Sequence, residues 1–171
     1  MPTGLTVRRF RDGDGPRVRE LNEVALRSAG DYAEDVPEPD LDDVPGHYLD
    51  RDGEFLIGRH GGEIVATGAY YHVDEWPLAG RFDFDRRTAE LTSVRVDPDY
   101  QRRGFGRALY QELEYRARGD GYHQIVLDTG AGNDAAQSFY DSLGFRFIGE
   151  ERLEGFGETF ELAVYWKSLI G

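Results

Sequence analysis

Hydrophobic and polar positions along this chain predict a mixture of strands and helices. Runs of β-branched and aromatic residues bounded by glycine or proline are typical of strands, and apolar residues three or four apart are typical of helices. We expect strands over Leu5–Phe10, Glu54–Arg59, Glu63–Val73, Ala89–Val96, Gln124–Asp128, Phe147–Leu153 and Thr159–Lys167. We expect helices from Asp12 or Asp14 to Gly30, from Arg107 to Ala117 and from Asn133 to Leu143. This order indicates a single α/β domain over residues 1–171.

Local sequence adds detail to these elements. The apolar face of the first helix is expected at Leu21, Val24, Ala25 and Ala29. The turn His60–Gly62 joins two strands into a hairpin, and the imperfect alternation over Ala89–Val96 indicates a β-bulge. Between Asp31 and Asp52 the chain is acidic and contains prolines, so we expect a loop with one short helix near His47–Leu49.

The composition narrows the classes of function. The chain has 33 acidic residues against 20 Lys and Arg, and its formal charge of −13 disfavours a nucleic-acid partner. Cysteine is absent, which excludes disulfides and thiolate catalysis. No secretory leader and no apolar run of about 18 residues is present, so we expect a cytoplasmic location and no membrane partner. The acidic bias is common to halophilic, salt-adapted proteins and to chains from GC-rich genomes, and both origins remain open.

A glycine loop follows the strand Ala89–Val96 and leads into the next helix. Unpaired backbone N–H groups and the positive helix end converge at such a place, which makes it a general anion site. A nucleotide P-loop requires Lys-Ser or Lys-Thr after its last glycine, but Arg107 and Ala108 follow Gly106 here. A dinucleotide-binding loop requires a third glycine where Leu109 stands. Both classes are therefore excluded.

Two motifs of this chain match one family. The run from Gln101 to Gly106, Gln-Arg-Arg-Gly-Phe-Gly, matches the Gln/Arg-x-x-Gly-x-Gly/Ala signature of GNAT-family N-acetyltransferases. Downstream, a second family pattern, Asn-x-x-Ala-x-x-x-Tyr-x-x-x-Gly-Phe, is matched without a gap by Asn133, Ala136, Tyr140, Gly144 and Phe145. The chain thus resembles the GNAT family, with specific signal over residues 89–145 and a compatible order of elements elsewhere.

The resemblance implies a fold and a coenzyme. The fold would be a mixed, mostly antiparallel central sheet flanked by helices, opened between the strands Ala89–Val96 and Gln124–Asp128 to admit acetyl-CoA as the acyl donor. The arginines of the glycine loop suit its pyrophosphate because a guanidinium donates paired hydrogen bonds to phosphate. The residues implied in coenzyme binding are Val94, Val96, Gln101, Arg102, Arg103, Gly104, Phe105, Gly106, Arg107, Asn133 and Tyr140.

Acyl transfer to an amine requires a base, because an alkylammonium has a pKa near 10.4 and is about 99.9% protonated at pH 7. By resemblance, Glu90 is the candidate base and Tyr140 the group that protonates the departing sulfur. A solvated glutamate at the strand end and a core tyrosine are the structural alternatives. Three further acids compete with Glu90 for the role of base: Asp83, Asp85 and Glu161.

The acyl acceptor is not encoded in any motif. The resemblance implies a primary amine, on a small molecule or on a protein N-terminus or lysine, and the acidic segment Asp31–Asp43 favours a cationic one. A catalytically silent acyl-CoA sensor on the same fold, a longer acyl group and a homodimer built through Glu150–Gly157 remain open. The four histidines are scattered, so we assign no metal. Four aromatic residues are candidates either for an acceptor pocket or for core packing: Tyr70, Tyr71, Trp76 and Trp166.

Overall fold

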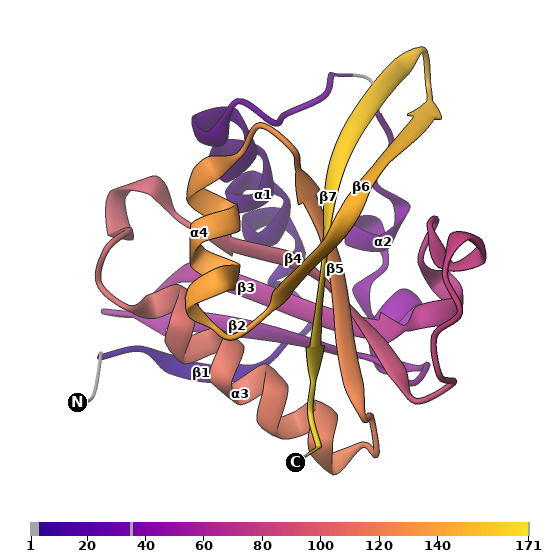
Figure 1. Cartoon of the computed structure of the whole chain (residues 1–171). Coiled ribbons are helices and arrows are strands. Elements are labelled where there is room, and N and C mark those ends of the chain that lie inside the picture. The colour runs from indigo at the N-terminus through magenta and orange to yellow at the C-terminus, as the bar shows by residue number, and fades with distance from the viewer. Residues whose placement is uncertain (1–3, 35, 171) are drawn as a thin grey trace.

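A computed structural model describes residues 4–34 and 36–170 of the chain. It contains one seven-stranded sheet in the order β1-β2-β3-β4-β5-β7-β6 (Figure 1). The strands are β1 (Thr6–Arg9), β2 (Glu54–His60), β3 (Glu63–His72), β4 (Thr88–Val96), β5 (Gln124–Gly130), β6 (Arg146–Gly155) and β7 (Glu158–Ser168). All neighbouring strands pair antiparallel except β4 and β5, which pair parallel. The expected mixed, mostly antiparallel sheet is confirmed.

Helices cover both faces of the sheet. Helices α3 (Phe105–Gly119) and α4 (Asp134–Ser142) lie on one face, and α1 (Gly15–Ala29) lies on the other together with the short helices α2 (Pro39–Asp42) and η1 (Pro45–Leu49) (Figure 1). Side chains alternate between the two cores along a strand. On β2, Leu56 packs in the core beneath α3, whereas its neighbours Phe55 and Ile57 pack with α1 and η1.

The N-terminal helix corrects two expectations. Val18, Leu21, Asn22 and Ala25 form the buried face of α1, whereas Val24 is 40% exposed and Ala29 is also exposed. Val24 and Ala29 were therefore wrongly placed on the apolar face. Asp14 precedes α1 as expected of an N-cap, but its carboxylate accepts from the Arg8 side chain and the Arg11 backbone instead of capping the helix.

The parallel pair β4–β5 is short, and this opens the sheet. Its register runs from Thr88 opposite Gln124 to Glu90 opposite Val126 and stops there. Beyond Glu90 the two strands diverge, so that edge of β4 has no strand beside it. The predicted opening between these strands is thus present in the fold.

The predicted bulge lies in the same strand. Ser93 has φ 54°, and the register between β3 and β4 shifts opposite Gly68. A Cβ on Gly68 would stand only 2.7 Å from the Leu113 side chain and 2.8 Å from that of Leu109. The bulge therefore sits where α3 approaches the sheet so closely that only glycine fits.

Candidate functional site

The glycine loop presents a row of free amides at the start of α3. Within the residues that the structure describes, none of the backbone N–H groups from Arg102 to Arg107 donates a hydrogen bond. Gly104 precedes the helix with φ 79°, a left-handed conformation that suits glycine. Phe105 is buried and packs against the rings of Tyr100 and His60, which fixes the loop. Its side chain is thus a core anchor, and only its amide faces a ligand.

The three loop arginines are exposed around these amides. Arg103 lies over the ring of Tyr100 at 5.1 Å, and Arg107 donates to the Ser142 hydroxyl at 3.0 Å. Gln101 reaches the carbonyl of Val96 at 3.5 Å. Free amides, a helix N-terminus and exposed cationic side chains together make a site suited to a polyanion such as a pyrophosphate.

Val94 and Val96 lie on the edge of β4 that β5 leaves free. Their side chains pack against the core beneath α3 and α4, as expected of core residues. A Cβ on Gly106 would lie 3.4 Å from Val96 and 3.2 Å from the Phe139 ring, so the glycine loop is in close contact with this strand edge. A long thin ligand that leaves the loop would therefore run along β4 toward the opening.

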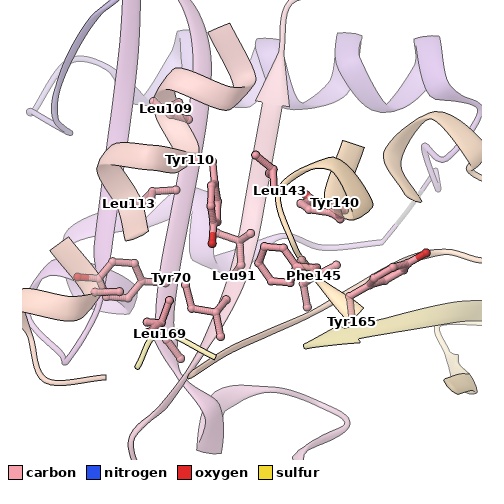
Figure 2. Close-up of a cluster of buried hydrophobic side chains, with 14 of the residues drawn as sticks. Tyr70, Leu91, Leu109, Tyr110, Leu113, Tyr140, Leu143, Phe145, Tyr165 and Leu169 are labelled. Atoms are coloured by element: carbon pink, nitrogen blue, oxygen red, sulfur yellow. The ribbon is translucent and has the colours of Figure 1, made fainter. Parts of the chain in front are cut away.

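Tyr140 stands at this opening. It is 9% exposed and packs against the ring of Phe139. It also contacts the rings of Phe145 and Tyr165 (Figure 2). Burial raises the pKa of Tyr140 to about 12, so the hydroxyl keeps its proton at neutral pH. In the described part of the chain this hydroxyl makes no hydrogen bond, and it is not sealed from solvent. Tyr140 thus packs in the core, as one alternative held, and also offers a free hydroxyl.

Asn133 has both of its side-chain polar atoms engaged. Its Oδ1 accepts from the Ala136 amide at 3.0 Å, which caps α4, and its Nδ2 donates to Asp31 at 2.7 Å. Asn133 is therefore the N-cap of α4. The bond to Asp31 also ties the acidic loop after α1 to the start of α4, and a coenzyme contact of Asn133 stays a prediction.

Glu90 lies on the opposite face of β4 from the glycine loop and is buried. It is 4% exposed and stands between Tyr71 of β3 and Val126 of β5. Its Oε2 atom is buried without a hydrogen-bond partner. Burial raises its pKa well above the usual range, and the charges of Asp128 and Asp40 raise it further. The alternative of a solvated strand-end glutamate is therefore wrong.

Asp128 lies near Glu90, on the neighbouring strand β5. It accepts from the Trp76 indole N–H at 2.7 Å. Burial raises the pKa of Asp128, although the hydrogen bond from Trp76 and the positive charge of Arg95 act in the opposite direction. Two carboxyl groups with raised pKa thus lie where the two strands begin to diverge, one on each strand.

Aromatic residues surround the carboxyl pair of Glu90 and Asp128. Tyr71 stacks on Tyr48 at 5.3 Å, and the Tyr48 hydroxyl donates to Asp40 at 2.6 Å. Trp76 is buried and holds Asp128, so it serves both packing and the site. Tyr70 and Trp166 instead make hydrogen bonds away from the pair, with Asp120 and Gln124 respectively.

The rival bases lie elsewhere. Asp83 and Asp85 are exposed in the connection before β4, where Asp85 accepts from the Arg87 amide. Glu161 is exposed and pairs with Arg152 at 2.8 Å on the outer part of β7. The residues described contain no group of three or more His, Cys, Asp or Glu side chains suited to a metal ion. They also contain no helix long and apolar enough to cross a bilayer.

Residues 18–145 match the sequence profile of the Acetyltransferase (GNAT) family. This chain belongs to the GNAT family. The match covers the free-amide loop, the strand opening and the carboxyl pair, so the candidate site lies wholly within the family region.

Relatives of this GNAT protein are N-acetyltransferases. It is 29% identical over 149 residues to N-acetyltransferase family 8 member 2 of Rattus norvegicus, which covers 82% of this chain and 63% of the relative. N-acetyltransferase 8 of Mus musculus is 30% identical over 128 residues, covering 74% and 54% respectively. The chain thus spans less than two thirds of the length of these mammalian relatives. A ribosomal protein bS18-alanine N-acetyltransferase of Escherichia coli is 46% identical over 57 residues, 33% of this chain and 38% of that protein.

Solved structures share the fold over nearly the whole chain. A GNAT-family acetyltransferase from Staphylococcus aureus Mu50 superposes with a TM-score of 0.79 at 19% identity, covering 97% of this chain and 99% of the other. An acetyltransferase from Salmonella typhimurium, solved with its cofactor acetyl-CoA, gives a TM-score of 0.75 at 24% identity, covering 98% and 95%. At such identities the likeness establishes the fold.

Sequence reasoning missed two polar residues of this GNAT site, Asp128 and Arg95. Asp128 was assigned only as the end of a strand. Because β4 and β5 are adjacent and parallel, their carboxyl ends meet at one edge, and that rule singles out Asp128. Arg95 lies within the bulged strand, and no motif singles it out. Only its contact with α1 reveals that it is part-buried on that face of the sheet.

Proposed function

We propose that this GNAT protein transfers an acetyl group from acetyl-CoA to a primary amine of a small molecule or of a protein N-terminus or lysine. The observation that carries the proposal is the opening between β4 and β5, which has the free hydroxyl of Tyr140 on one side and the carboxyl groups of Glu90 and Asp128 on the other. An acyl donor that enters from the glycine loop would place its thioester between these groups.

The coenzyme would bind along residues already described. Its pyrophosphate would accept from the free amides of residues 102–107 while Arg102, Arg103 and Arg107 neutralise its charge. The pantetheine arm would follow the unpaired edge of β4 past Val96 and Val94. Holding donor and acceptor side by side contributes most to the rate, since oriented partners account for about 7–11 kcal/mol of a barrier.

Two protons must leave the acceptor nitrogen, and the site has two carboxyl groups to receive them. Glu90 in its ionised form accepts the proton that makes the ammonium a neutral amine. The nitrogen then bonds to the thioester carbon as the carbon–sulfur bond breaks, and Asp128 accepts the second proton. Tyr140 donates its hydroxyl proton to the departing sulfur. Glu90 and Asp128 then release their two protons, one of which restores Tyr140 while the other enters solvent, so protons and charges balance.

The acidic surroundings favour a cationic acceptor. A hollow of about 400 Å³ between α1 and the following loop is lined by Glu20, Glu23, Glu38 and Asp42, with Arg19 as the one lining base. Asp31 and Asp40 add to the negative charge on this side of the sheet. The whole chain as one acetyltransferase domain and a cytoplasmic location are part of the same proposal. A catalytically silent sensor is not favoured, because packing alone gives no reason to bury two carboxyl groups.

The test separates coenzyme binding from turnover. Isothermal titration with acetyl-CoA, at low and at molar salt, is expected to show binding that weakens in an Arg102→Gln/Arg103→Gln variant. Release of free thiol with a panel of amines is expected to fall about 10²–10⁴-fold in Glu90→Gln. Tyr140→Phe should also lower turnover while acetyl-CoA still binds.

Matched controls are available on the surface. Glu161→Gln removes an exposed carboxylate and Tyr115→Phe an exposed hydroxyl, and both should leave turnover unchanged. Absence of acetyl-CoA binding at either salt concentration would overturn the proposed function. Full turnover in both Glu90→Gln and Tyr140→Phe would overturn the assigned roles.

A further inference from the structure

Arg95 is a part-buried cation that has no carboxylate partner within the described residues. It follows the bulge of β4 and points to the face of the sheet that α1 and Glu90 occupy, opposite to its neighbours Val94 and Val96. Its Nε donates to the Asn22 side-chain carbonyl at 2.9 Å, and its Nη1 donates to the Val94 carbonyl at 2.9 Å. Among residues 4–34 and 36–170 it forms no ion pair.

Other part-buried arginines of this chain have carboxylate partners. Arg8 pairs with Asp14, Arg17 pairs with Asp97 and Arg116 pairs with Glu54, at distances from 2.7 to 3.4 Å. Burying a cation without a partner costs free energy, and burial accordingly lowers the pKa of Arg95. The fold holds this guanidinium with neutral acceptors and leaves its charge uncompensated by direct contact.

The neighbouring carboxyl group is held off by an amide. Asn22, which is 4% exposed, accepts from Arg95 with its oxygen and donates with its nitrogen to Glu38 at 2.6 Å. Glu38 therefore acts on Arg95 only at a distance, as Asp31 does, and burial raises the pKa of Glu38 toward its neutral form. Asn22 fixes the guanidinium without neutralising it.

Arg95 belongs to the part of β4 that borders the opening, beyond the last residue paired with β5. Arg95 Nη2 makes no hydrogen bond in the described part of the chain and is not sealed from solvent. The charge of Arg95 acts on both Tyr140 and Asp128, so it lies near the opening, yet it forms no ion pair with Asp128. Arg95 and Asp128 thus lie near each other without pairing, and each can still bind a ligand. A molecule that carries both a negative and a positive charge suits such a pair.

We propose that Arg95 binds a carboxylate of the acyl acceptor, and that the acceptor is a compound with a carboxylate beside its reacting amine, as in a free α-amino acid. The ammonium then faces Asp128 and Glu90 while the carboxylate accepts from Arg95 Nη2. This inference rests on the proposed acyl transfer and narrows its acceptor to a zwitterion. Amines without the carboxylate leave the buried guanidinium uncompensated and bind more weakly.

The experiment compares matched acceptors. Turnover of α-amino acids is measured beside that of their α-carboxamides, which keep the amine and lose the negative charge. A hydrogen bond to a charged group contributes about 1.5–3 kcal/mol, so the wild-type protein should prefer each acid over its amide by about 10–150-fold in kcat/KM. Equal use of acids and amides, or a preference for amides, would overturn the inference and support an acceptor recognised by positive charge alone.

Variants of Arg95 test whether this residue binds the carboxylate of the acceptor. In Arg95→Gln the preference for acids over amides should disappear, while Arg95→Lys should retain part of it. The exposed Arg146→Gln is the matched control and should keep the full preference. The quantity measured is the ratio of kcat/KM for an acid to kcat/KM for its amide on the same protein. If Arg95 has only a structural role, its replacement lowers both values equally and leaves this ratio unchanged. An unchanged ratio in Arg95→Gln therefore counts against the inference.

Failure of the proposed function is distinguishable from failure of this inference. Lack of acetyl-CoA binding, or binding without turnover of any acid, amide or simple amine, contradicts acyl transfer itself. Turnover of amides and simple amines at the rate of acids contradicts only the role of Arg95. Should Arg95→Gln fail to fold by thermal melting, the wild-type ratio and Arg95→Lys still decide the outcome.

Discussion

Replacing Glu90 by Gln should stabilise this protein at pH 8 while it removes activity. In the folded chain the Glu90 carboxyl is buried, its Oε2 has no partner, and Asp128 and Asp40 oppose its ionisation. An unsatisfied buried polar group costs about 1–3 kcal/mol, and more when it is charged. The amide of Gln stays neutral at every pH and avoids the cost of protonating or charging this carboxyl at pH 8, so a gain of about 1–3 kcal/mol in the free energy of unfolding is expected there.

The sign of the pH dependence follows from the raised pKa. Between the unfolded-state pKa of Glu90 and its higher folded-state pKa, the folded protein holds a proton that the unfolded chain releases. Wild-type stability therefore falls as pH rises through this window, by at most about 1.4 kcal/mol per pH unit for this residue. The difference between Glu90→Gln and wild type should vanish near pH 4, grow with pH, and level off once Glu90 ionises in the folded protein.

Thermal melting at several pH values tests this reasoning. A gain of 1 kcal/mol corresponds to about 2–4 °C in Tm for a protein of this size. The exposed Glu161→Gln should shift Tm little at any pH. If Glu90→Gln melts lower than wild type at pH 8, or if the difference does not change with pH, Glu90 is not the uncompensated buried acid that the structure indicates.

Four further outcomes are expected. Gly68→Ala should lose about 1–3 kcal/mol in urea unfolding because its Cβ meets two α3 leucines, whereas Gly132→Ala, in open space, should not. Gly104→Ala should weaken acetyl-CoA binding in titrations, since φ 79° costs an alanine about 1–2 kcal/mol. Asp128→Asn removes a charge that raises the pKa of Glu90, so the acidic limb of the kcat/KM profile should move to lower pH. Tm should rise with KCl if salt screens the net charge of −13, and a constant Tm would contradict salt adaptation.

The helices and strands could be predicted from sequence because hydrophobic periodicity and the glycines and prolines that bound each element are local features of the chain. The turn His60–Gly62 and the β-branched and aromatic residues on either side of it predicted the hairpin of β2 and β3. The imperfect alternation over Ala89–Val96 predicted a bulge, which lies at Ser93. The face of α1 was misjudged because Asn22 looks like a surface residue. It is buried because Arg95 and Glu38 satisfy its amide, and no local pattern reports partners so distant in the chain.

The candidate site was predicted where it depends on contiguous residues. The glycine loop and the α4 motif are short runs, and their backbone geometry is set by neighbours in sequence. Asp128 and Arg95 belong to the site because two strands diverge and a helix packs across one of them. Their burial changes their pKa values. Burial depends on the assembled sheet, so it cannot be predicted from composition or motif spacing.

Several groups with unused hydrogen-bonding capacity lie along one path through the described part of this molecule. It begins at the free amides of residues 102–107, passes the hydroxyl of Tyr140, and ends at Glu90 Oε2 and Arg95 Nη2 on the other face. Each unsatisfied group lowers stability, and proteins satisfy most such groups. These groups come in a definite order of charge. The loop amides suit an anion, the Tyr140 hydroxyl is a neutral proton donor, and Glu90 and Arg95 are an acid and a cation. That order matches a polyanionic donor entering from one side and a zwitterionic amine from the other, which meet where β4 and β5 part.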